Sequence, residues 1–175
     1  MQIWKLSSEK RSTFYLTILG VWGMVAVYAV LHDQYIVRIC PEHFTLYHEP
    51  MWGLSDPAQL AAAWAFNASF SPGLALGLAC AFVARNGTWP KISPVTVYKG
   101  VLVVIVVAEM CSMLSGWWVY QSQEPLLPRW VYPSDDPNLL ITATIQWVCY
   151  LTSGLGSGCL LLWILKVRRK NFKIS

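Results

Sequence analysis

Residues 95–120 read VTVYKGVLVVIVVAEMCSMLSGWWVY, an apolar run that is long enough to cross a lipid bilayer as one helix. A spanning helix needs about 20 residues, each of which adds about 1.5 Å to its length. Three other runs meet this requirement, at about 13–32, 58–84 and 138–167. We therefore predict an all-α integral membrane protein in which residues 1–175 form a single domain of four transmembrane helices.

The composition favours a membrane protein over a soluble one. The 175 residues are 55% hydrophobic and only 13% charged, whereas a soluble domain carries about 25% charged residues. The net charge of +4 comes from basic residues that gather near the ends of the apolar runs. Such residues set membrane topology and meet anionic lipid. We therefore expect the protein to have the lipid bilayer as its partner and to bind lipid. We do not expect it to bind nucleic acid.

The distribution of lysine and arginine predicts how the helices are oriented. Short loops rich in these residues stay in the cytoplasm. Basic residues cluster at 5–11, 85–99 and 166–173, and these three segments fall on one side of the predicted membrane, against Arg38 and Arg129 on the other. We expect both termini in the cytoplasm and the loops 33–57 and 121–137 outside it.

Small residues predict how the helices associate. When the sequence is compared with itself at a shift of 81 positions, Gly73 and Gly77 align with Gly154 and Gly158, which indicates two related segments. Glycines spaced by four in a membrane helix form a groove through which another backbone approaches closely. We therefore predict two helical hairpins, each with a packing groove at its pair of glycines.

The first outer loop has a pattern typical of strands. Residues 35–40 and 43–48 are rich in β-branched and aromatic types, with Pro41 and Glu42 between them as a turn. If the two segments pair, one face is largely apolar and the other largely polar. This alternation predicts a short β-hairpin-like lid between the first two helices.

The same loop concentrates residues that carry chemistry. Cys40, Glu42, His43 and His48 are of the types that bind zinc, iron or copper, so a transition-metal site is one hypothesis. A second hypothesis is that Cys40 and His43 form a nucleophile pair, with Arg38 as a neighbouring positive charge.

A structural role is the third hypothesis for the loop. In it, a polar cluster with His32, Asp33 and Arg38 holds the loop to the bundle through hydrogen bonds. No pattern requires a cofactor. Haem is disfavoured because no histidine lies inside a predicted spanning helix to act as an axial ligand, His32 being at the very end of the first run.

Three polar residues within the predicted helices form a second candidate site. Counted inward at about 1.5 Å per residue, Asn67, Glu109 and Gln146 lie at similar depth on three different helices. A carboxylate inside the membrane is expensive and often functional, which suggests a proton or cation relay. Alternatively, a protonated Glu109 bonded to Asn67 or Gln146 joins the helices.

The loop motif R-x-C-P-E-x-F-T-x-x-H-x-P at residues 38–50 resembles that of a widespread family of small bacterial membrane proteins to which no activity is attached. The family has a tyrosine where this chain has His43. The resemblance implies a four-helix membrane protein and no reaction. We expect the membrane to be a bacterial inner membrane.

The function expected from these patterns is that of a non-enzymatic subunit or assembly partner in a larger membrane complex. The chain has more small-residue grooves and aromatic edges than four helices need for one another, and it lacks a convergent catalytic set. The alternatives are a metal-dependent membrane enzyme with its site at residues 32–50, and a small proton- or ion-conducting oligomer that uses Glu109.

Overall fold

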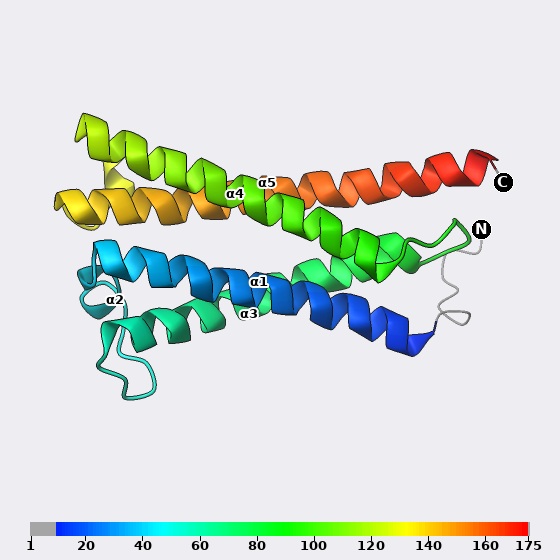
Figure 1. Ribbon diagram of the computed structural model, residues 1–175, viewed down its shortest axis with the longest axis horizontal. Helices are drawn as coiled ribbons and strands as arrows, with labels where there is room; N and C mark the ends of the chain where they lie inside the picture. Colours follow the sequence, from blue (N-terminus) through cyan, green and yellow to red (C-terminus); the bar gives the residue numbers. More distant parts are fainter. Residues whose placement is uncertain (1–9, 175) are drawn as a thin grey trace.

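The computed structural model describes residues 10–174; residues 1–9 and 175, among them Lys5 of the predicted basic N-terminus, lie outside the described part. The chain forms α1 (Arg11–Ile39), α2 (Glu42–Thr45), α3 (Pro57–Arg85), α4 (Pro94–Ser122), the 3-10 turn η2 (Arg129–Val131) and α5 (Pro137–Ile174) (Figure 1). Of these, α1, α3, α4 and α5 are long and apolar enough to cross a membrane. The prediction of an all-helical chain with four such helices is confirmed.

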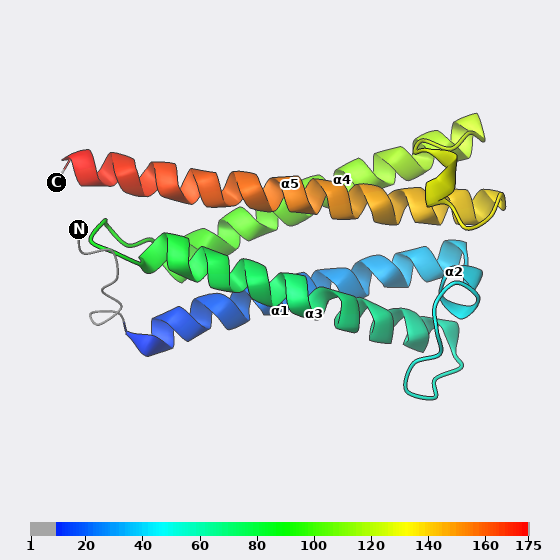
Figure 2. The same cartoon turned by 180° about the vertical axis from the view of Figure 1, so that it is seen from behind.

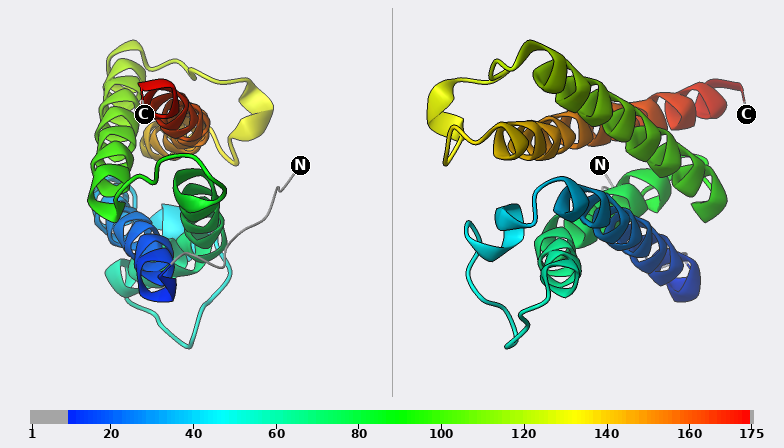
Figure 3. Two further views of the ribbon diagram at one scale, coloured as in Figure 1. Left: turned by 90° about the vertical axis from the view of Figure 1, so that its right-hand side faces the viewer. Right: turned by 60° about the vertical axis from the view of Figure 1, so that its left-hand side comes forward.

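The long helices associate in pairs. Most of the contacts of α1 are with α3, and most of those of α4 are with α5 (Figures 1 and 2). Figure 3 shows α4 running from its place beside α5 toward α1, and this crossing joins the two pairs. The beginning of α1 and the end of α5 lie at one end of the bundle, called the terminal end here. The other end carries α2 and η2 and is called the α2 end.

Three of the long helices begin with the same local signal. The side chains of Asp56, Ser93 and Asp136 each accept a hydrogen bond from a backbone N–H three residues later, at 2.9, 3.2 and 3.0 Å. In each case proline is the next residue and starts the helix. An acceptor at the N-cap followed by proline satisfies a free N–H and presets the helical backbone.

The apolar core is divided between the two ends of the bundle. One buried cluster at the α2 end includes Ile36, Phe44 and Ile145, and another at the terminal end includes Val97 and Ile164, each with further residues of the long helices. Of the 18 most apolar consecutive residues in each spanning helix, only 17–28% are buried inside the protein. The larger part of each apolar helix surface is therefore left for lipid or for another protein.

The predicted β-hairpin lid is wrong. Residues 35–39 continue α1, and Glu42–Thr45 form the short helix α2, so residues 10–174 contain no strand. The alternation of types in residues 35–40 is outweighed by burial with a helical period, because Asp33, Ile36, Val37 and Cys40 all face the interior. Pro41 then ends the helix.

The four glycines of the predicted packing grooves, which are Gly73, Gly77, Gly154 and Gly158, have different surroundings. A Cβ atom added at Gly77 would lie 2.6 Å from the carbonyl oxygen of Ile18, so the backbones of α1 and α3 meet there. A Cβ atom at Gly73 would lie 3.2 Å from the ring of Trp22. No described atom lies within 4 Å of a Cβ added at Gly154 or Gly158. Close backbone approach thus needs the glycine at Gly77.

Arg168 lies inside the terminal end, although it belongs to the basic segment 166–173. Its side chain is only 3% exposed. The guanidinium donates hydrogen bonds to the carbonyls of Val83, Asn86, Trp89 and Pro90, at 2.5 to 2.9 Å. These carbonyls belong to the end of α3 and the turn that follows it. Arg168 therefore fastens α5 to that turn.

Candidate functional site

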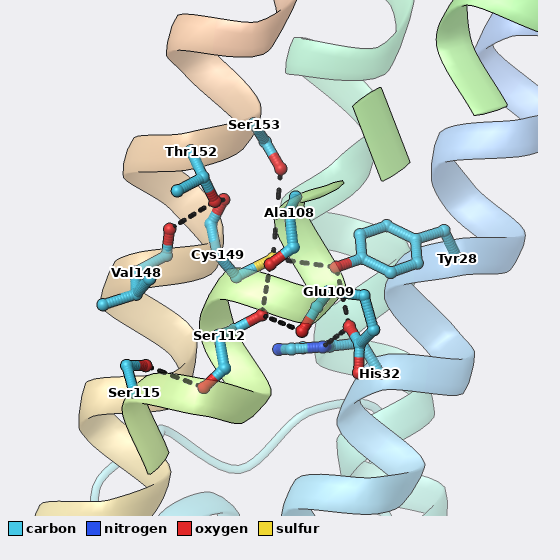
Figure 4. A network of polar contacts seen from close by, with 10 residues as sticks. All are labelled: Tyr28, His32, Ala108, Glu109, Ser112, Ser115, Val148, Cys149, Thr152 and Ser153. Carbon is cyan, nitrogen blue, oxygen red and sulfur yellow. Dashed lines mark hydrogen bonds and ion pairs between the residues drawn. The ribbon is translucent and has the colours of Figure 1, made fainter. Parts of the chain in front are cut away.

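A carboxylate in the middle of α4 joins three helices (Figure 4). Nδ1 of His32 lies 2.7 Å from Oε2 of Glu109, and the hydroxyl of Tyr28 donates to the same oxygen at 2.9 Å. The Tyr28 hydroxyl also lies 3.1 Å from Sγ of Cys149 on α5. We call Tyr28, His32, Glu109 and Cys149 the intramembrane cluster. Through it, α1, α4 and α5 share one network of polar contacts.

The cluster lies well inside the apolar part of the bundle. Glu109 is 13 positions before the end of α4, and His32 is 7 positions before the end of α1, so they lie about 20 and 10 Å along their helices from the α2 end. His32 is almost fully enclosed, with 4% of its side chain exposed, whereas Glu109 keeps 25%. Glu109 therefore reaches from the interior to the surface of the bundle.

The hydrogen bonds limit how the cluster can be protonated. An ionised Glu109 accepts from both Nδ1–H of His32 and the hydroxyl of Tyr28. A neutral His32 ring then presents Nε2 as an acceptor, whereas a protonated ring presents it as a donor. Nε2 is buried and finds no partner among the described residues. The cluster thus leaves one ring nitrogen of His32 enclosed without a hydrogen bond from the described residues.

A cavity of about 560 Å³ lies beside the cluster. All four spanning helices line it, and the lining includes His32, Asp33, Tyr28 and Cys149. Most other lining residues are apolar or small: Val25, Ala29, Ala65, Ala68, Pro72, Leu76, Val101, Val104, Ile105 and Gly154. Among the described lining residues there is no lysine or arginine. An apolar pocket with a few convergent polar groups is the usual form of a small-molecule site.

The outer-loop residues are already engaged with one another and with α5. Nδ1 of His43 lies 3.1 Å from Oγ1 of Thr142, and Nε2 lies 2.5 Å from Oε1 of Gln146. Nδ1 of His48 donates to the carbonyl of His43 at 2.7 Å. Both ring nitrogens of His43 are therefore used for holding α2 against α5.

The metal and nucleophile hypotheses find no support in this geometry. Within residues 10–174, no three histidine, cysteine or acidic side chains are grouped so that they could hold a metal ion. The thiol of Cys40 donates to Glu42 at 3.6 Å, and burial raises its pKa. Burial also lowers the pKa of His43 to about 4. A protonated thiol beside a carboxylate is a poor nucleophile. The loop contacts are those of a structural lid.

The predicted layer of Asn67, Glu109 and Gln146 is replaced by two separate networks. Asn67 lies exposed on α3. Gln146 bonds to His43 and donates to the hydroxyl of Tyr150 at 2.8 Å, while Glu109 bonds within the intramembrane cluster. Of the predicted polar loop cluster, Arg38 is exposed, whereas His32 and Asp33 are buried in α1.

The expectation that no histidine lies in a spanning helix is wrong. The apolar run was expected to end near residue 32, but α1 continues to Ile39 and takes His32 and Asp33 into the helix. The helical spacing of Asp33, Ile36, Val37 and Cys40 was the signal that could have shown this.

No protein-family model, no curated protein and no solved structure matches the chain. Indications of function therefore come from the geometry of the intramembrane cluster and the surfaces around it.

Proposed function

We propose that the chain is a non-enzymatic subunit or assembly partner of a larger membrane protein complex. The observation that carries the proposal is the position of Glu109. This carboxylate lies in the middle of a spanning helix, and a quarter of its side chain is exposed although it contacts His32 and Tyr28. An acidic side chain at the centre of a helix in hydrocarbon costs about 2.5–3.5 kcal/mol. A partner that covers this surface reduces the cost.

The surface around Glu109 has the form of a helix-binding face. Leu102, Val106, Met113 and Trp117 are exposed and recur with Glu109 on one side of α4, and these five residues are called the α4 face here. A single polar group within an apolar helix face favours association with a helix that offers a hydrogen bond. Methionine adapts its shape to such a neighbour. The partner expected is therefore another membrane helix with a donor near its middle.

The same proposal includes an orientation. The terminal end and the turn between α3 and α4 carry the basic residues Arg11, Arg85, Lys91 and Arg169. Short loops that are rich in basic residues stay in the cytoplasm. We infer a bacterial inner membrane with the terminal end in the cytoplasm. The helix pairs α1–α3 and α4–α5 then act as two helical hairpins, and α2 covers the outer side.

The intramembrane cluster favours a second candidate, a small proton-conducting oligomer. His32, Asp33 and Glu109 bring three titratable side chains to neighbouring positions inside the bundle, and His32 and Glu109 are in direct contact. Chains of such groups are typical of proton relays. In this case the partner at the α4 face is a second copy of the chain.

Gentle solubilisation from native membranes, followed by native mass spectrometry, tests the first proposal. We expect a stoichiometric complex with another membrane protein. Glu109→Leu should release the partner, while Glu109→Gln keeps the hydrogen bonds and the partner. Leu155→Ala, at an exposed position of α5, is the matched control and should leave the complex intact. A chain that is alone in every preparation contradicts the proposal.

A homo-oligomer without another protein would favour the second candidate. Proton flux into liposomes that contain the purified protein then decides. In the variant Glu109→Gln the side chain at this position cannot ionise, so we expect proton flux to be lost if Glu109 is part of a relay. Flux that is unchanged in this variant contradicts a relay through Glu109.

A further inference from the structure

We infer that the cavity between the four spanning helices holds the end of an acyl chain of a bilayer phospholipid. The chain enters from the middle of the membrane, through a mouth between α3 and α5, while the head group of the lipid stays at the membrane surface. The inference depends on the interior of the bundle and stands whether or not the α4 face has a partner.

The cavity opens between α3 and α5. Of its described lining residues, four are exposed: Ala68 and Pro72 of α3, and Tyr150 and Gly154 of α5. The lining residues of α1 and α4 are all buried or half-buried. The helices α3 and α5 belong to different pairs and diverge toward the α2 end (Figure 2). The four exposed residues therefore form the mouth of the cavity, and three of them have small side chains or none.

The mouth lies near the middle of the membrane. At about 1.5 Å per residue, its four residues are about 17–26 Å along their helices from the α2 end. The helix α3 has 29 residues, so its midpoint is about 22 Å from the same end. The hydrocarbon core is about 30 Å thick and consists of two layers of lipid chains, whose ends meet at the midplane. Chain ends are therefore the part of the bilayer that faces the mouth.

The polar side chains of the lining offer little to a polar ligand. The hydroxyl of Tyr28 donates to Glu109 at 2.9 Å, and that of Ser69 donates at 3.0 Å to a backbone carbonyl of its own helix. Nδ1 of His32 is held by Glu109, and Nε2 is enclosed, so that no ligand reaches it. Asp33 is about 9 Å from the α2 end, and so lies beyond the level of the mouth. At that level the lining is mainly apolar.

Hydrocarbon is the occupant that such a space favours. Water does not fill an apolar cavity, and a cavity of about 560 Å³ without an occupant would leave the lining atoms without dispersion contacts. A lipid chain is as apolar as the side chains of the lining, so it moves from one apolar environment into another. The chain end therefore gains contacts and loses no hydration.

Photolabelling of the full-length protein in lipid nanodiscs tests the site. Two phosphatidylcholine probes carry a diazirine, one at the end of an acyl chain and the other next to the ester, and mass spectrometry locates the label. We expect the chain-end probe to label Val25 and Ala29 of α1, which line the cavity and are not exposed. The probe labelled next to the ester should leave both residues unlabelled.

Val27 is the internal control for this measurement. It lies between the two lining residues in α1 and is 61% exposed, so the chain-end probe reaches it from the surrounding bilayer. Label on Val27 without label on Val25 or Ala29 would overturn the inference.

Two glycines of α5 provide matched variants. Gly154 lies at the mouth and Gly158 does not line the cavity, and neither has a described atom within 4 Å of an added Cβ. In Gly154→Leu the new side chain competes with the lipid chain for space, so labelling of Ala29 should fall at least about fivefold. Gly158→Leu should leave it unchanged. Equal labelling of Ala29 in the two folded variants would contradict a chain that enters beside Gly154.

A second variant adds volume at the opposite wall. Ala29→Leu extends a lining side chain of α1 and should lower the labelling of Val25, whereas Val27→Leu, at the exposed neighbour, should not. Thermal unfolding identifies the variants that are folded. Labelling of Val25 that is unchanged in both Gly154→Leu and Ala29→Leu would show that no lipid chain lies in the cavity.

Discussion

His32 and Glu109 are 77 positions apart in the chain, and Nδ1 of one lies 2.7 Å from a carboxylate oxygen of the other, inside the apolar part of the bundle. The contact joins α1 of one helix pair to α4 of the other. It leaves a quarter of the Glu109 side chain exposed. The proposed partner at the α4 face would cover this exposed part of Glu109.

Arg168 should be essential for stability. Arg168→Met removes the donor for the carbonyls of Val83, Asn86, Trp89 and Pro90. A buried carbonyl without a donor costs about 1–3 kcal/mol, so we expect the free energy of unfolding to fall by about 3 kcal/mol or more. Denaturant unfolding in detergent micelles measures the change. Arg169→Met, at an exposed neighbour, is the control and should have little effect.

Two glycines should respond to alanine in opposite directions. At Gly77 the new methyl group would meet the carbonyl oxygen of Ile18 at 2.6 Å, which forces α1 and α3 apart and destabilises the protein by about 1–3 kcal/mol. At Gly158 there is open space, and alanine is preferred to glycine in a helix by about 1 kcal/mol. Thermal unfolding of both variants checks this. Equal effects would mean that α1 and α3 do not meet at Gly77.

His43 should make the stability depend on pH. Burial lowers its pKa in the folded protein to about 4, whereas the ordinary value is 6.5. Below pH 6.5 the unfolded chain binds a proton at His43 and the folded chain does not, so the free energy of unfolding falls as the pH is lowered. The loss from this residue reaches on the order of 3 kcal/mol near pH 4.

The change His43→Asn isolates this contribution. Unfolding is measured from pH 7 to pH 4 for both proteins, and the difference between them removes the effect of the other histidines. We expect the variant to be less stable at pH 7 and to lose less stability on acidification. Parallel pH profiles would show that His43 is not held neutral in the folded state.

The four spanning helices were predictable because length and apolar content alone decide whether a segment can cross a membrane. The end of α1 was not predictable, because residues 35–40 are of amino-acid types that suit a strand as well as a helix. Only their burial on one side, from Asp33 to Cys40, separates the two structures, and burial depends on the neighbours in space.

The candidate site was predictable only in part. Glu109 stood out as a carboxylate in an apolar run, but its partner did not, since His32 was expected outside the membrane. The pairing also depends on the approach of α4 to α1, which connects residues that are far apart in the sequence. The cavity could not be predicted at all, because it is formed by residues from all four spanning helices.

Site-specific crosslinking in native membranes tests the proposed function most directly. A photoreactive amino acid replaces Met113 on the α4 face or, as a control, Leu155 on α5, which is 73% exposed. We expect the probe at position 113 to capture one other membrane protein and the probe at position 155 to capture lipid. Capture of no protein from position 113 beyond the level at position 155 would contradict a partner at the α4 face.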